Sequence, residues 1–414
     1  MLIKRNVDVL VIGGGASGLA AAVSAKESGA EKVLVIERNE RLGGILNQCI
    51  HDGFGLEIFQ QSLTGPEYMQ YYIDRAASMG VEFLFPAMVI DVQQGRVYAS
   101  SEGAVHEITA KSIVFATGCR ERTAGSICLP GSRPAGIFTA GTAQHYINCA
   151  NKMIGRKAVI LGSGNIGMIM ARRLHLEGCK VESVVEILPY HTGLIRNRVQ
   201  CLEDWGIPLL LEHTVSRING RERLTSVNVA QVDEKQQIVP STEREIKCDT
   251  LILSVGLIPE NELLKKVGAY IDMKTGGPIV DGNFMTSIPG IFTSGNSLHV
   301  HDIVDWATLE SCRAGRNSAL FSMGTIETER SVEVGPGEGV RYVIPQKVFP
   351  EKDSEISFRA DIPGKSEEVL VTQGQEIIFK KFFRWVHPSE MIKVKIPKGV
   401  VREGKKVQVR LRRK

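Results

Sequence analysis

The sequence predicts an α/β protein with two doubly wound parallel sheets and a small C-terminal β domain. A glycine-rich turn between an apolar run and an Ala-rich helical stretch occurs twice, with the two first glycines 149 residues apart. Each turn leads to a second apolar run that ends in a glutamate, and short alternating segments follow both copies. Such alternation of strands and helices is typical of parallel sheets with helices on both faces. Beyond residue 330, short Val, Ile and Phe runs broken by Pro and Gly indicate strands without helices.

The length predicts several domains. A chain of 414 residues is too long for one ordinary hydrophobic core. Residues 1–122 and 275–330 are predicted to form a first, discontinuous module. A second module, residues 123–274, is inserted into it, and residues 331–414 form the β domain.

Further elements follow the same order in both modules. A helix is predicted over residues 66–80, where Pro66 stands near the start and Gly80 past the end. Short segments between 81 and 109 suit an antiparallel meander, and residues 112–118 form a buried strand. In the second module a helix is expected at 196–205, a strand at 209–211 and a buried strand at 249–256. A long helix is expected at 303–323.

The first glycine turn has the spacing of a dinucleotide-binding turn. Its residues are Gly13, Gly14, Gly15, Ala16, Ser17 and Gly18, and Glu37 closes the next apolar strand. In this pattern the first glycine permits a tight turn and the second lets the backbone approach a pyrophosphate. The third lets helix and strand pack closely, while the helix N-terminus presents N–H groups to negative charge. The acid at the end of the second strand accepts hydrogen bonds from the ribose.

The second turn repeats the pattern in the same register. Its residues are Gly162, Ser163, Gly164, Asn165, Ile166 and Gly167, and Glu186 stands 19 residues after the last glycine, as Glu37 does in the first copy. No arginine pair follows Glu186 to welcome a 2′-phosphate, so NAD is expected there rather than NADP. Two structural βα turns without ligand are the alternative reading, because a fold can persist after its ligand is lost.

Composition is ordinary for a globular protein that is not embedded in a membrane. Apolar residues make up 43% and charged residues 23%, and the net charge of +4 says little about partners. No run approaches the ~20 apolar residues of a transmembrane helix, and the first strand follows Asn6 without room for a signal peptide. A cytoplasmic protein is therefore expected. The eight cysteines form no C-x-x-C pair, which argues against structural disulfides.

The C-terminal tail is basic. From Lys393 onward ten lysines and arginines stand against Glu403 alone. A solvated edge of strands, protected by lysines, explains this pattern, and an acidic partner or a membrane surface is the alternative. Nucleic acid is not expected to bind, because no aromatic residue interrupts the tail.

Residues 7–325 resemble the two-dinucleotide flavoproteins of the pyridine nucleotide–disulfide oxidoreductase superfamily. Besides the two turns and their acids, the likeness rests on Ala116-Thr117-Gly118 and on Gly290-Ile291-Phe292-Thr293-Ser294-Gly295-Asn296. The resemblance implies FAD in the first module and NAD(H) in the second. The resemblance also implies further cofactor-binding residues, which are Arg38, Gly44, Thr117, Gly118, Gly256, Gly295 and Asn296. Asn296 stands where the family usually has an aspartate that binds the ribityl chain, and an amide can still donate and accept hydrogen bonds.

The redox disulfide of that superfamily is not expected here. Cys49 follows Gly43-Gly44 without a second cysteine, so electrons must leave the flavin by another route. Segments 43–55, 133–144 and 299–306 are similar to a flavoprotein group that accompanies bacterial anaerobic glycerol-3-phosphate dehydrogenase, and the middle segment also resembles subunits of amino-acid dehydrogenases and hydrogen cyanide synthase. This likeness implies an oligomer in which a partner subunit or a small iron–sulfur protein exchanges electrons with the flavin.

The expected reaction is hydride transfer between nicotinamide and flavin, which needs no obligatory protein nucleophile. Cys49 and His51 are interpreted as flavin neighbours, with a solvent-exposed turn as the alternative. His299 and His301 form a cluster with Asp302 and Asp305. Either a histidine is expected to tune the flavin or Asp302 is expected to cap the following helix, and no metal is assigned. Two other functions stay open: a self-sufficient FAD dehydrogenase for a metabolite such as glycerol 3-phosphate, and a non-catalytic redox-sensing or scaffold subunit.

Overall fold

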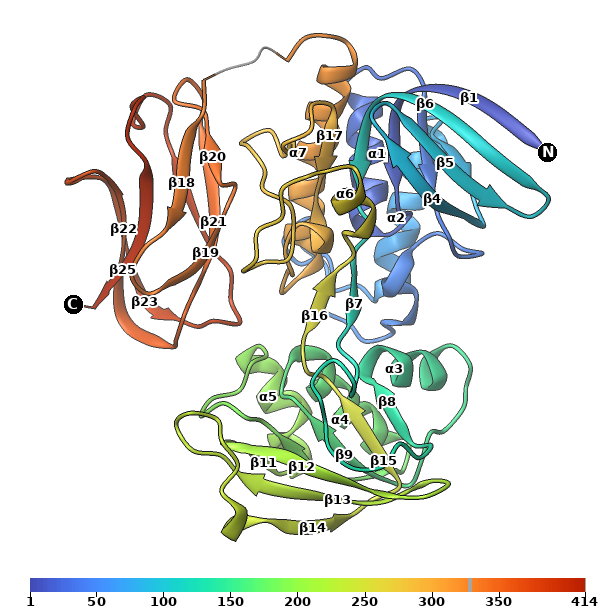
Figure 1. Cartoon of the computed structure of the whole chain (residues 1–414), viewed down its shortest axis with the longest axis vertical. Coiled ribbons are helices and arrows are strands. Elements are labelled where there is room, and N and C mark those ends of the chain that lie inside the picture. Colours follow the sequence, from blue (N-terminus) through green and yellow to red (C-terminus); the bar gives the residue numbers. More distant parts are fainter. Residues whose placement is uncertain (327–329, 414) are drawn as a thin grey trace. The chain divides into compact units, whose positions relative to one another are not determined.

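The computed structural model describes residues 1–326 and 330–413 (Figure 1). Contacts divide the chain into two compact units, one of Met1–Cys119 with Pro259–Lys414 and one of Arg120–Ile258. The chain returns to the first unit at Pro259, ahead of the predicted boundary at residue 275. This occurs because α6 (Glu262–Lys266) packs against β4 (Ala87–Gln93) and buries Leu264 in the core of that unit.

The first unit is built on a seven-stranded sheet in the order β3-β2-β1-β6-β5-β4, with β17 paired to β6. Strands β3, β2, β1, β6 and β17 run parallel, and β4 and β5 are antiparallel. The remaining strands are β1 (Leu2–Ile12), β2 (Val33–Ile36), β3 (Glu82–Leu84), β5 (Arg96–Ser101), β6 (Ala104–Phe115) and β17 (Ile291–Thr293).

The two faces of this sheet have different covers. Val9 and Val11 of β1 pack with α1 (Ala16–Glu27), α2 (Gly65–Ser78) and α7 (Val304–Ser322). The alternate residues Leu10 and Ile12 pack with β4, β5 and α6. The second face is therefore covered mainly by the antiparallel strands β4 and β5, together with the short helix α6.

Two strand predictions need correction. Residues 81–85 were expected in the meander, but β3 pairs in parallel with β2. The separate strands expected at 106–109 and 112–118 are one strand, β6, because Ala110 stays buried and no Gly or Pro interrupts the chain between them. The helix expected at 66–80 is confirmed as α2, which starts with a capping box: the side chain of Thr64 accepts from the Glu67 N–H, and Glu67 bonds back to the Thr64 N–H at 2.8 Å.

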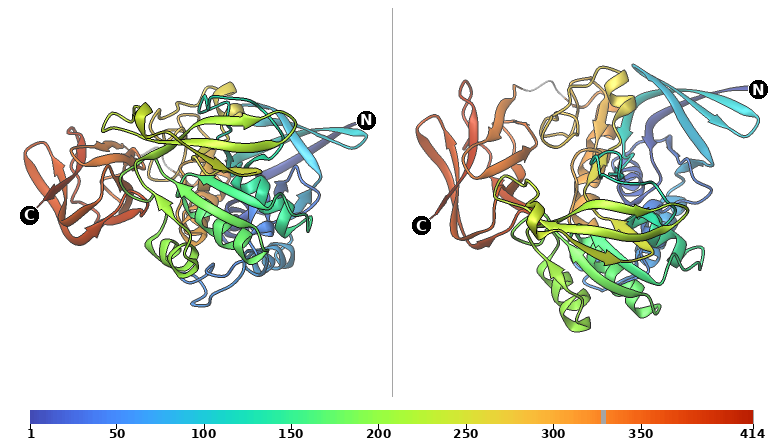
Figure 2. Two further views of the ribbon diagram at one scale, coloured as in Figure 1. Left: turned by 90° about the horizontal axis from the view of Figure 1, so that it is seen from below. Right: turned by 60° about the horizontal axis from the view of Figure 1, so that its bottom comes forward.

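The second unit has a five-stranded parallel sheet in the order β11-β10-β9-β15-β8 and a three-stranded antiparallel sheet β12-β13-β14. Helices cover one face of the parallel sheet and the antiparallel strands cover the other (Figure 2, green helices and yellow-green strands). The elements are β8 (Ile137–Thr139), α3 (Ala140–Asn148), β9 (Lys157–Leu161), α4 (Asn165–Leu176), β10 (Lys180–Val185), α5 (Ile195–Cys201), η2 (Glu203–Trp205), β11 (Leu209–Leu210), β12 (His213–Gly220), β13 (Leu224–Gln231), η3 (Pro240–Thr242), β14 (Arg244–Lys247) and β15 (Thr250–Leu253). Strands β7 (Cys119–Glu121) and β16 (Leu257–Pro259) pair where the chain passes between the units.

Residues after 331 form strands, as predicted. Two sheets, β20-β18-β25-β22-β23 and β19-β21-β24, share one apolar core. A smaller cluster buries Tyr342 and Ile344 with Phe284, Leu298 and Ala314 of the preceding part of the unit. The strands are β18 (Val332–Pro336), β19 (Val340–Ile344), β20 (Lys347–Val348), β21 (Ser354–Ala360), β22 (Gly364–Gln373), β23 (Glu376–Val386), β24 (Ile392–Ile396) and β25 (Val407–Arg413).

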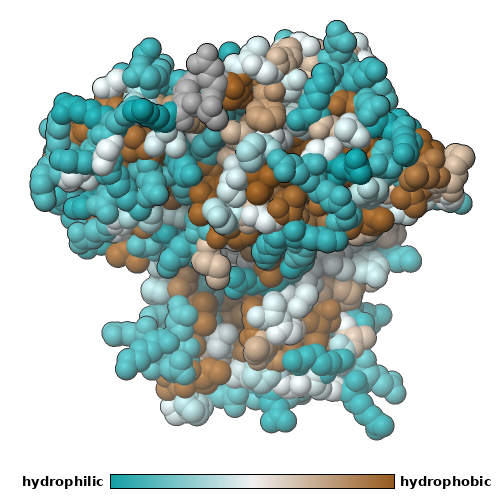
Figure 3. All heavy atoms as spheres, turned by 45° about the horizontal axis from the view of Figure 1, so that its top comes forward, coloured by the Kyte–Doolittle hydropathy of each residue, from teal (hydrophilic) through white to brown (hydrophobic). Residues whose placement is uncertain are grey.

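Hydrophilic side chains are spread over the face shown in Figure 3, with hydrophobic residues between them. Among the described residues, no helix combines the length and the apolar character that crossing a membrane requires.

Candidate functional site

The first glycine turn has the geometry that its pattern predicts. Gly13 has φ +112°, and a Cβ there would lie 2.3 Å from the carbonyl oxygen of Ala116. A Cβ on Gly18 would lie 1.8 Å from the oxygen of Gly13, so helix α1 and the turn are in direct contact. Gly15 is open, since the nearest atom to its Cβ position is 3.9 Å away. No side chain of the described residues caps α1, so its first N–H groups can bind a pyrophosphate in this space.

Glu37 is buried and oriented by the backbone. One carboxylate oxygen accepts the N–H of Gly14 and the other accepts the N–H of Asn39, both at 2.8 Å. Each oxygen keeps a second lone pair for a ribose hydroxyl. The neighbouring Arg38 is exposed.

Two further segments lie against this turn. The N–H of Gly43 donates to Gly14 O at 2.8 Å, and a Cβ on Gly44 would lie 3.1 Å from the Cα of Gly15. Gly295, in the 3₁₀ turn η4 (Gly295–Ser297), comes so close to α1 that a Cβ would lie 2.0 Å from the Oγ of Ser17. Glu37, Gly44 and Gly295, which the sequence assigns to FAD, therefore lie around the turn at the start of α1, and their chemistry fits a dinucleotide.

The second unit repeats this geometry. Gly162 has φ +98°, and its Cβ position lies 2.1 Å from Ser254 O. Glu186 is buried and accepts the N–H groups of Ser163, at 2.9 Å, and Leu188, at 3.1 Å. These donors stand at the same positions relative to the glutamate and its glycine turn as Gly14 and Asn39 do for Glu37.

The second acid carries additional hydrogen bonds. The hydroxyl groups of Ser163 and Thr192 donate to the same oxygen of Glu186, at 2.6 and 3.3 Å. The Oδ1 atom of Asn165, the first residue of α4, accepts the N–H of Leu194 at 2.7 Å and the amide of Asn197 at 2.9 Å. Because Gly14 has no hydroxyl, this arrangement is specific to the second copy. It leaves the other oxygen of Glu186 as the better acceptor for a ribose.

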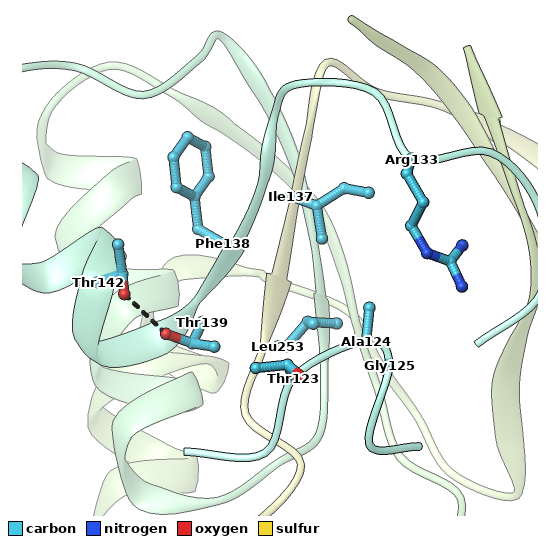
Figure 4. Close-up of a pocket in the computed structure, with 9 residues that line it drawn as sticks. All are labelled: Thr123, Ala124, Gly125, Arg133, Ile137, Phe138, Thr139, Thr142 and Leu253. Carbon is cyan, nitrogen blue, oxygen red and sulfur yellow. Dashed lines mark hydrogen bonds between the residues drawn. The ribbon is translucent and has the colours of Figure 1, made fainter. Parts of the chain in front are cut away.

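A pocket of about 340 Å³ opens at the carboxyl ends of β8 and β15 (Figure 4). The hydroxyls of Thr139 and Thr142 share a hydrogen bond of 2.9 Å on one side of it. The guanidinium of Arg133 lies on the other side and donates to the carbonyl oxygens of Leu129, Gly131 and Ser132. The carboxyl ends of parallel strands are where doubly wound sheets bind ligands. Sequence reasoning did not predict this pocket.

Asn296 is engaged by the residues that follow it. Its Oδ1 accepts the backbone N–H of His301 at 3.0 Å, which fixes the orientation of the amide, and Nδ1 of His301 lies 3.3 Å from the same oxygen. The other amide atom, Nδ2, lies 3.6 Å from Sγ of Cys119. The amide thus holds the 296–301 segment in a closed turn beside Gly295.

His299 and His301 both face Glu310 of α7. Their Nε2 atoms lie 3.0 and 3.5 Å from one carboxylate oxygen, and the other oxygen accepts the N–H of Gly295 at 2.8 Å. Burial, with the charge of His301, lowers the pKa of His299 to about 4, so His299 is neutral near pH 7. Burial opposes charge on Glu310, but His301 and His299 hold its pKa below the usual range. Since the three ligand atoms lie within 4.8 Å of one another, they could also hold a metal, which the sequence did not assign.

The sequence did not point to Glu310, Tyr342 or Arg359 as part of this site. Nδ1 of His299 lies 3.2 Å from the Tyr342 hydroxyl, which also accepts Nε of Arg359 at 3.0 Å. Arg359 bonds Asp302 and donates to Val300 O at 2.9 Å. The expected capping of α7 by Asp302 is therefore wrong: the carboxylate pairs with Arg359, and Ile303 is the N-cap residue. Only Glu310 could have been found from the sequence, because it is a charged residue on the Ala- and Ser-rich face of a predicted helix.

Cys49 and His51 lie in a separate segment. The Sγ atom of Cys49 is 3.5 Å from Ile45 O, after the 3₁₀ helix η1 (Gly44–Gln48), and the ring of His51 lies 4.9 Å from that of Phe54. Asp305 ties this segment to the start of α7, because its carboxylate accepts the N–H groups of Gly55 and Ile58. The catalytic roles expected for these two residues and for His299 and His301 stay predictions.

The other predicted contact positions lie at strand ends. The hydroxyl of Thr117 donates to Glu260 O at 2.7 Å, while Gly118 and Gly256 have φ +71° and +104°. All eight cysteines belong to the described residues and are free thiols. Burial raises the pKa of Cys179 and Cys312 to about 11 and that of Cys248 to about 12, so these three are poor thiolate nucleophiles.

Residues 7–313 match the family model described as "Pyridine nucleotide-disulphide oxidoreductase". The chain is 25% identical to one subunit of the opine oxidase of Agrobacterium tumefaciens over 78% of this chain and 67% of that protein. It is 24% identical to hydrogen cyanide synthase subunit HcnB of Pseudomonas protegens over 79% of this chain and 73% of that one. Among solved structures, the thioredoxin reductase of T. acidophilum matches with a TM-score of 0.63 at 24% identity, over 77% of this chain and 99% of that chain, which indicates a shared fold.

The fold and the paired glycine turns thus define a flavoprotein with two dinucleotide-binding modules, as the sequence predicted. The chain belongs to the pyridine nucleotide-disulphide oxidoreductase family. It is an FAD-dependent oxidoreductase, and its cofactors are FAD and NAD(P)H.

Proposed function

We propose that this chain exchanges hydride between NAD(H) and FAD and passes the electrons to or from a partner protein. One observation carries the proposal: Glu37 and Glu186 accept the same pair of backbone N–H groups beside equivalent glycine turns. Both sites thus keep a carboxylate oriented for a ribose. When bound, NAD(H) and FAD would supply the hydride chemistry, and the residues of the two glycine turns with their glutamates would hold and orient them.

The order of strands in the second unit supports a placement for the nucleotide. Glu186 follows β10, the glycine turn follows β9, and the pocket lies at the ends of β15 and β8, on the far side of that turn. Glu186 would hold the adenosine ribose of a dinucleotide bound over these strand ends, and the turn at Gly164 would hold its pyrophosphate. Thr139 and Thr142 would then line the space for its nicotinamide. The carboxylate of Glu186 repels a 2′-phosphate, which favours NADH over NADPH.

A partner is proposed because the sequence offers no pair of cysteines that could take electrons from the flavin as a redox disulfide. Cys49 has no second cysteine at the usual spacing after Gly43-Gly44. Two of the curated relatives are named as subunits, of opine oxidase and of hydrogen cyanide synthase. We infer by the same reasoning that the partner is a sister subunit or a small iron–sulfur protein. We also propose that the chain forms an oligomer and that it is cytoplasmic. Its specific likeness to flavoproteins that accompany glycerol-3-phosphate dehydrogenase is part of the same proposal.

An anaerobic titration of the FAD-bound protein with NADH, followed by flavin absorbance, tests the hydride exchange. We expect rapid bleaching, and slower bleaching with NADPH. Glu186→Gln is expected to weaken NADH binding about tenfold, because an amide NH₂ would face the N–H donors of Ser163 or Leu188. Glu182→Gln, on the same strand, is the control. A flavin that NADH leaves oxidised would contradict the proposal, and reduction by glycerol 3-phosphate instead would support a self-sufficient dehydrogenase.

The placement of the nicotinamide has its own test. Thr142→Trp fills the pocket and is expected to slow bleaching at saturating NADH, while ADP-ribose still binds. His145→Trp changes an exposed residue of the same helix outside the pocket and is expected to leave the rate unchanged. Equal rates for the two variants would place the nicotinamide elsewhere.

A further inference from the structure

Strand β23 is a long edge strand on the C-terminal β domain. It has eleven residues, and β22 is its only partner among the described strands. The opposite end of the same sheet is the two-residue strand β20. Natural sheets usually keep edge strands short, or protect them with charges, because a free edge offers backbone N–H and C=O groups to another chain. A full-length edge strand therefore needs an explanation.

The side chains of β23 combine exposed apolar groups with positive charge. Ile377, Phe382 and Trp385 are 49%, 51% and 61% exposed. Lys380, Lys381 and Arg384 stand between them and are also exposed. Lysine protection alone accounts for the charges, but it does not account for large apolar side chains on the same edge. Aromatic residues next to arginine are typical of the centres of protein interfaces.

The exposed ring of Trp385 is already oriented by a cation, and so is the half-buried ring of Phe383 on the same strand. The Nζ atom of Lys365 on β22 lies 4.6 Å from the centroid of the Trp385 ring, and Lys381 lies 5.1 Å from that of Phe383. Cation–π contacts of this kind hold a flat aromatic face in place at the surface. A partner strand would meet a preformed row of rings and ammonium groups.

The charge of this region selects an acidic partner. Residues 331–414 contain 18 lysines and arginines against 11 aspartates and glutamates, whereas the whole chain has a net charge of only +4. The two glutamates of β22 nearest to β23 are neutralised within the domain, since Glu367 pairs with Arg413 and Glu368 with Arg412. Both glutamates of β22 thus have an ion-pair partner on β25, the strand on the side away from β23.

A second copy of the chain is a poor occupant. Two β23 strands paired across a twofold axis would bring Lys380, Lys381 and Arg384 of each copy about 5 Å, the spacing of neighbouring strands, from the opposite strand. Like charges at that distance destabilise the pair. A membrane surface could satisfy the charges, but it offers no groups to pair with the free backbone edge.

We propose that β23 is a docking strand for an extended acidic segment of a partner protein, which adds to the sheet beside β23. Main-chain hydrogen bonds would provide affinity, and the alternating basic and aromatic side chains would provide specificity. This inference rests on the surface of the β domain and stands whether or not the partner exchanges electrons with the flavin.

The test uses the FAD-bound full chain and a fluorescein-labelled peptide of strand length that alternates valine and glutamate. Fluorescence anisotropy is expected to show saturable binding, and a peptide with lysine in place of glutamate is expected not to bind. Lys380→Glu/Lys381→Glu is expected to weaken binding about tenfold or more. Trp385→Ala should weaken it without any change of charge. Lys395→Glu, an equal change per residue on β24 in the other sheet, is the matched control.

Several outcomes would overturn the proposal. It fails if the glutamate peptide does not bind, or if Lys395→Glu weakens binding as much as Lys380→Glu/Lys381→Glu does. A dimer that forms through β23 and excludes the peptide would also overturn it. A membrane surface would be the partner instead if the protein binds vesicles of phosphatidylserine and phosphatidylcholine but not the peptide, and if Trp385→Ala abolishes the vesicle binding. NADH-dependent bleaching is measured in every variant and is expected to be unchanged, so failure of docking is distinguished from failure of the hydride exchange.

Discussion

Glu37 and Glu186 are the residues in which sequence and structure agree most closely. In both units the carboxylate accepts one N–H from the glycine turn and one from two residues beyond the glutamate. The spacing could be found in the sequence because a βαβ unit fixes the number of residues between the turn and the end of the second strand. The hydroxyls of Ser163 and Thr192 on Glu186 could not be found in this way, since Thr192 lies in a loop without a regular period.

His299 makes stability depend on pH. The pKa of an unfolded histidine is near 6.5, whereas burial lowers that of His299 to about 4. Between these values the unfolded chain binds a proton that the folded chain does not, so stability falls as the pH falls through this window. We expect His299 to contribute about 2 kcal/mol to the loss between pH 7 and pH 5.

Urea unfolding of the FAD-bound protein at the two pH values measures this loss. His299→Gln should reduce the difference between them, while His145→Gln, at an exposed histidine, should keep it. An unchanged pH dependence in His299→Gln would assign the effect to other groups.

At the scale of elements, the glycines show where helices and strands come closest. Gly295 has φ +67°, and its Cβ position lies 2.0 Å from the Oγ of Ser17 on α1. Gly103 has φ +71° with open space around it. Alanine at Gly103 therefore tests backbone strain alone, whereas alanine at Gly295 tests the same strain together with a clash against α1.

Gly103→Ala is expected to lower the free energy of unfolding by about 1 kcal/mol, the strain of a left-handed residue. Gly295→Ala adds a clash and should cost about 3 kcal/mol or more, with loss of bound FAD. Combining Gly295→Ala with Ser17→Gly should recover part of that loss. Chemical unfolding and the ratio of flavin to protein absorbance give the two readouts. Equal losses for both single variants would contradict the close approach of η4 and α1.

Helices with a long apolar periodicity were predicted correctly from the sequence. Strands were predicted poorly where their pairing or their packing on a sheet depends on residues far away in the chain. The long helix α7 and the capped helix α2 follow from periodicity and from Thr64, Pro66 and Glu67. The direction of β3 could not be read from its three residues, because it depends on pairing with β2. The antiparallel cover on the second face of each parallel sheet was missed for the same reason.

At the scale of the whole molecule, Arg359 joins the β domain to residues 300–302 of the same unit. It donates to Tyr342 and Pro388 of the β domain and to Val300, and it pairs with Asp302. Arg359→Gln leaves a nearly buried carboxylate without its partner. We expect a loss of about 3 kcal/mol in the free energy of unfolding, with faster release of FAD.

Arg402→Gln removes an exposed ion pair with Glu376 and should change stability by about 1 kcal/mol or less. Urea unfolding and the rate of flavin release on dilution measure both variants. If Arg359→Gln behaves like Arg402→Gln, the β domain and residues 300–302 are not coupled through this residue.

The class of the protein could be predicted from the sequence, because two glycine turns with their acids are local patterns whose geometry is set by short-range sterics. The sequence also located the residues at the start of α1 and α4 and the change to an all-β domain. Packing of the whole chain sets the contacts of Glu310 and Tyr342 with the histidines, the pairing of Asp302 with Arg359, and the place of β23 at a sheet edge. These depend on residues far apart in the chain, and no local period or spacing records which of them meet when the core is packed.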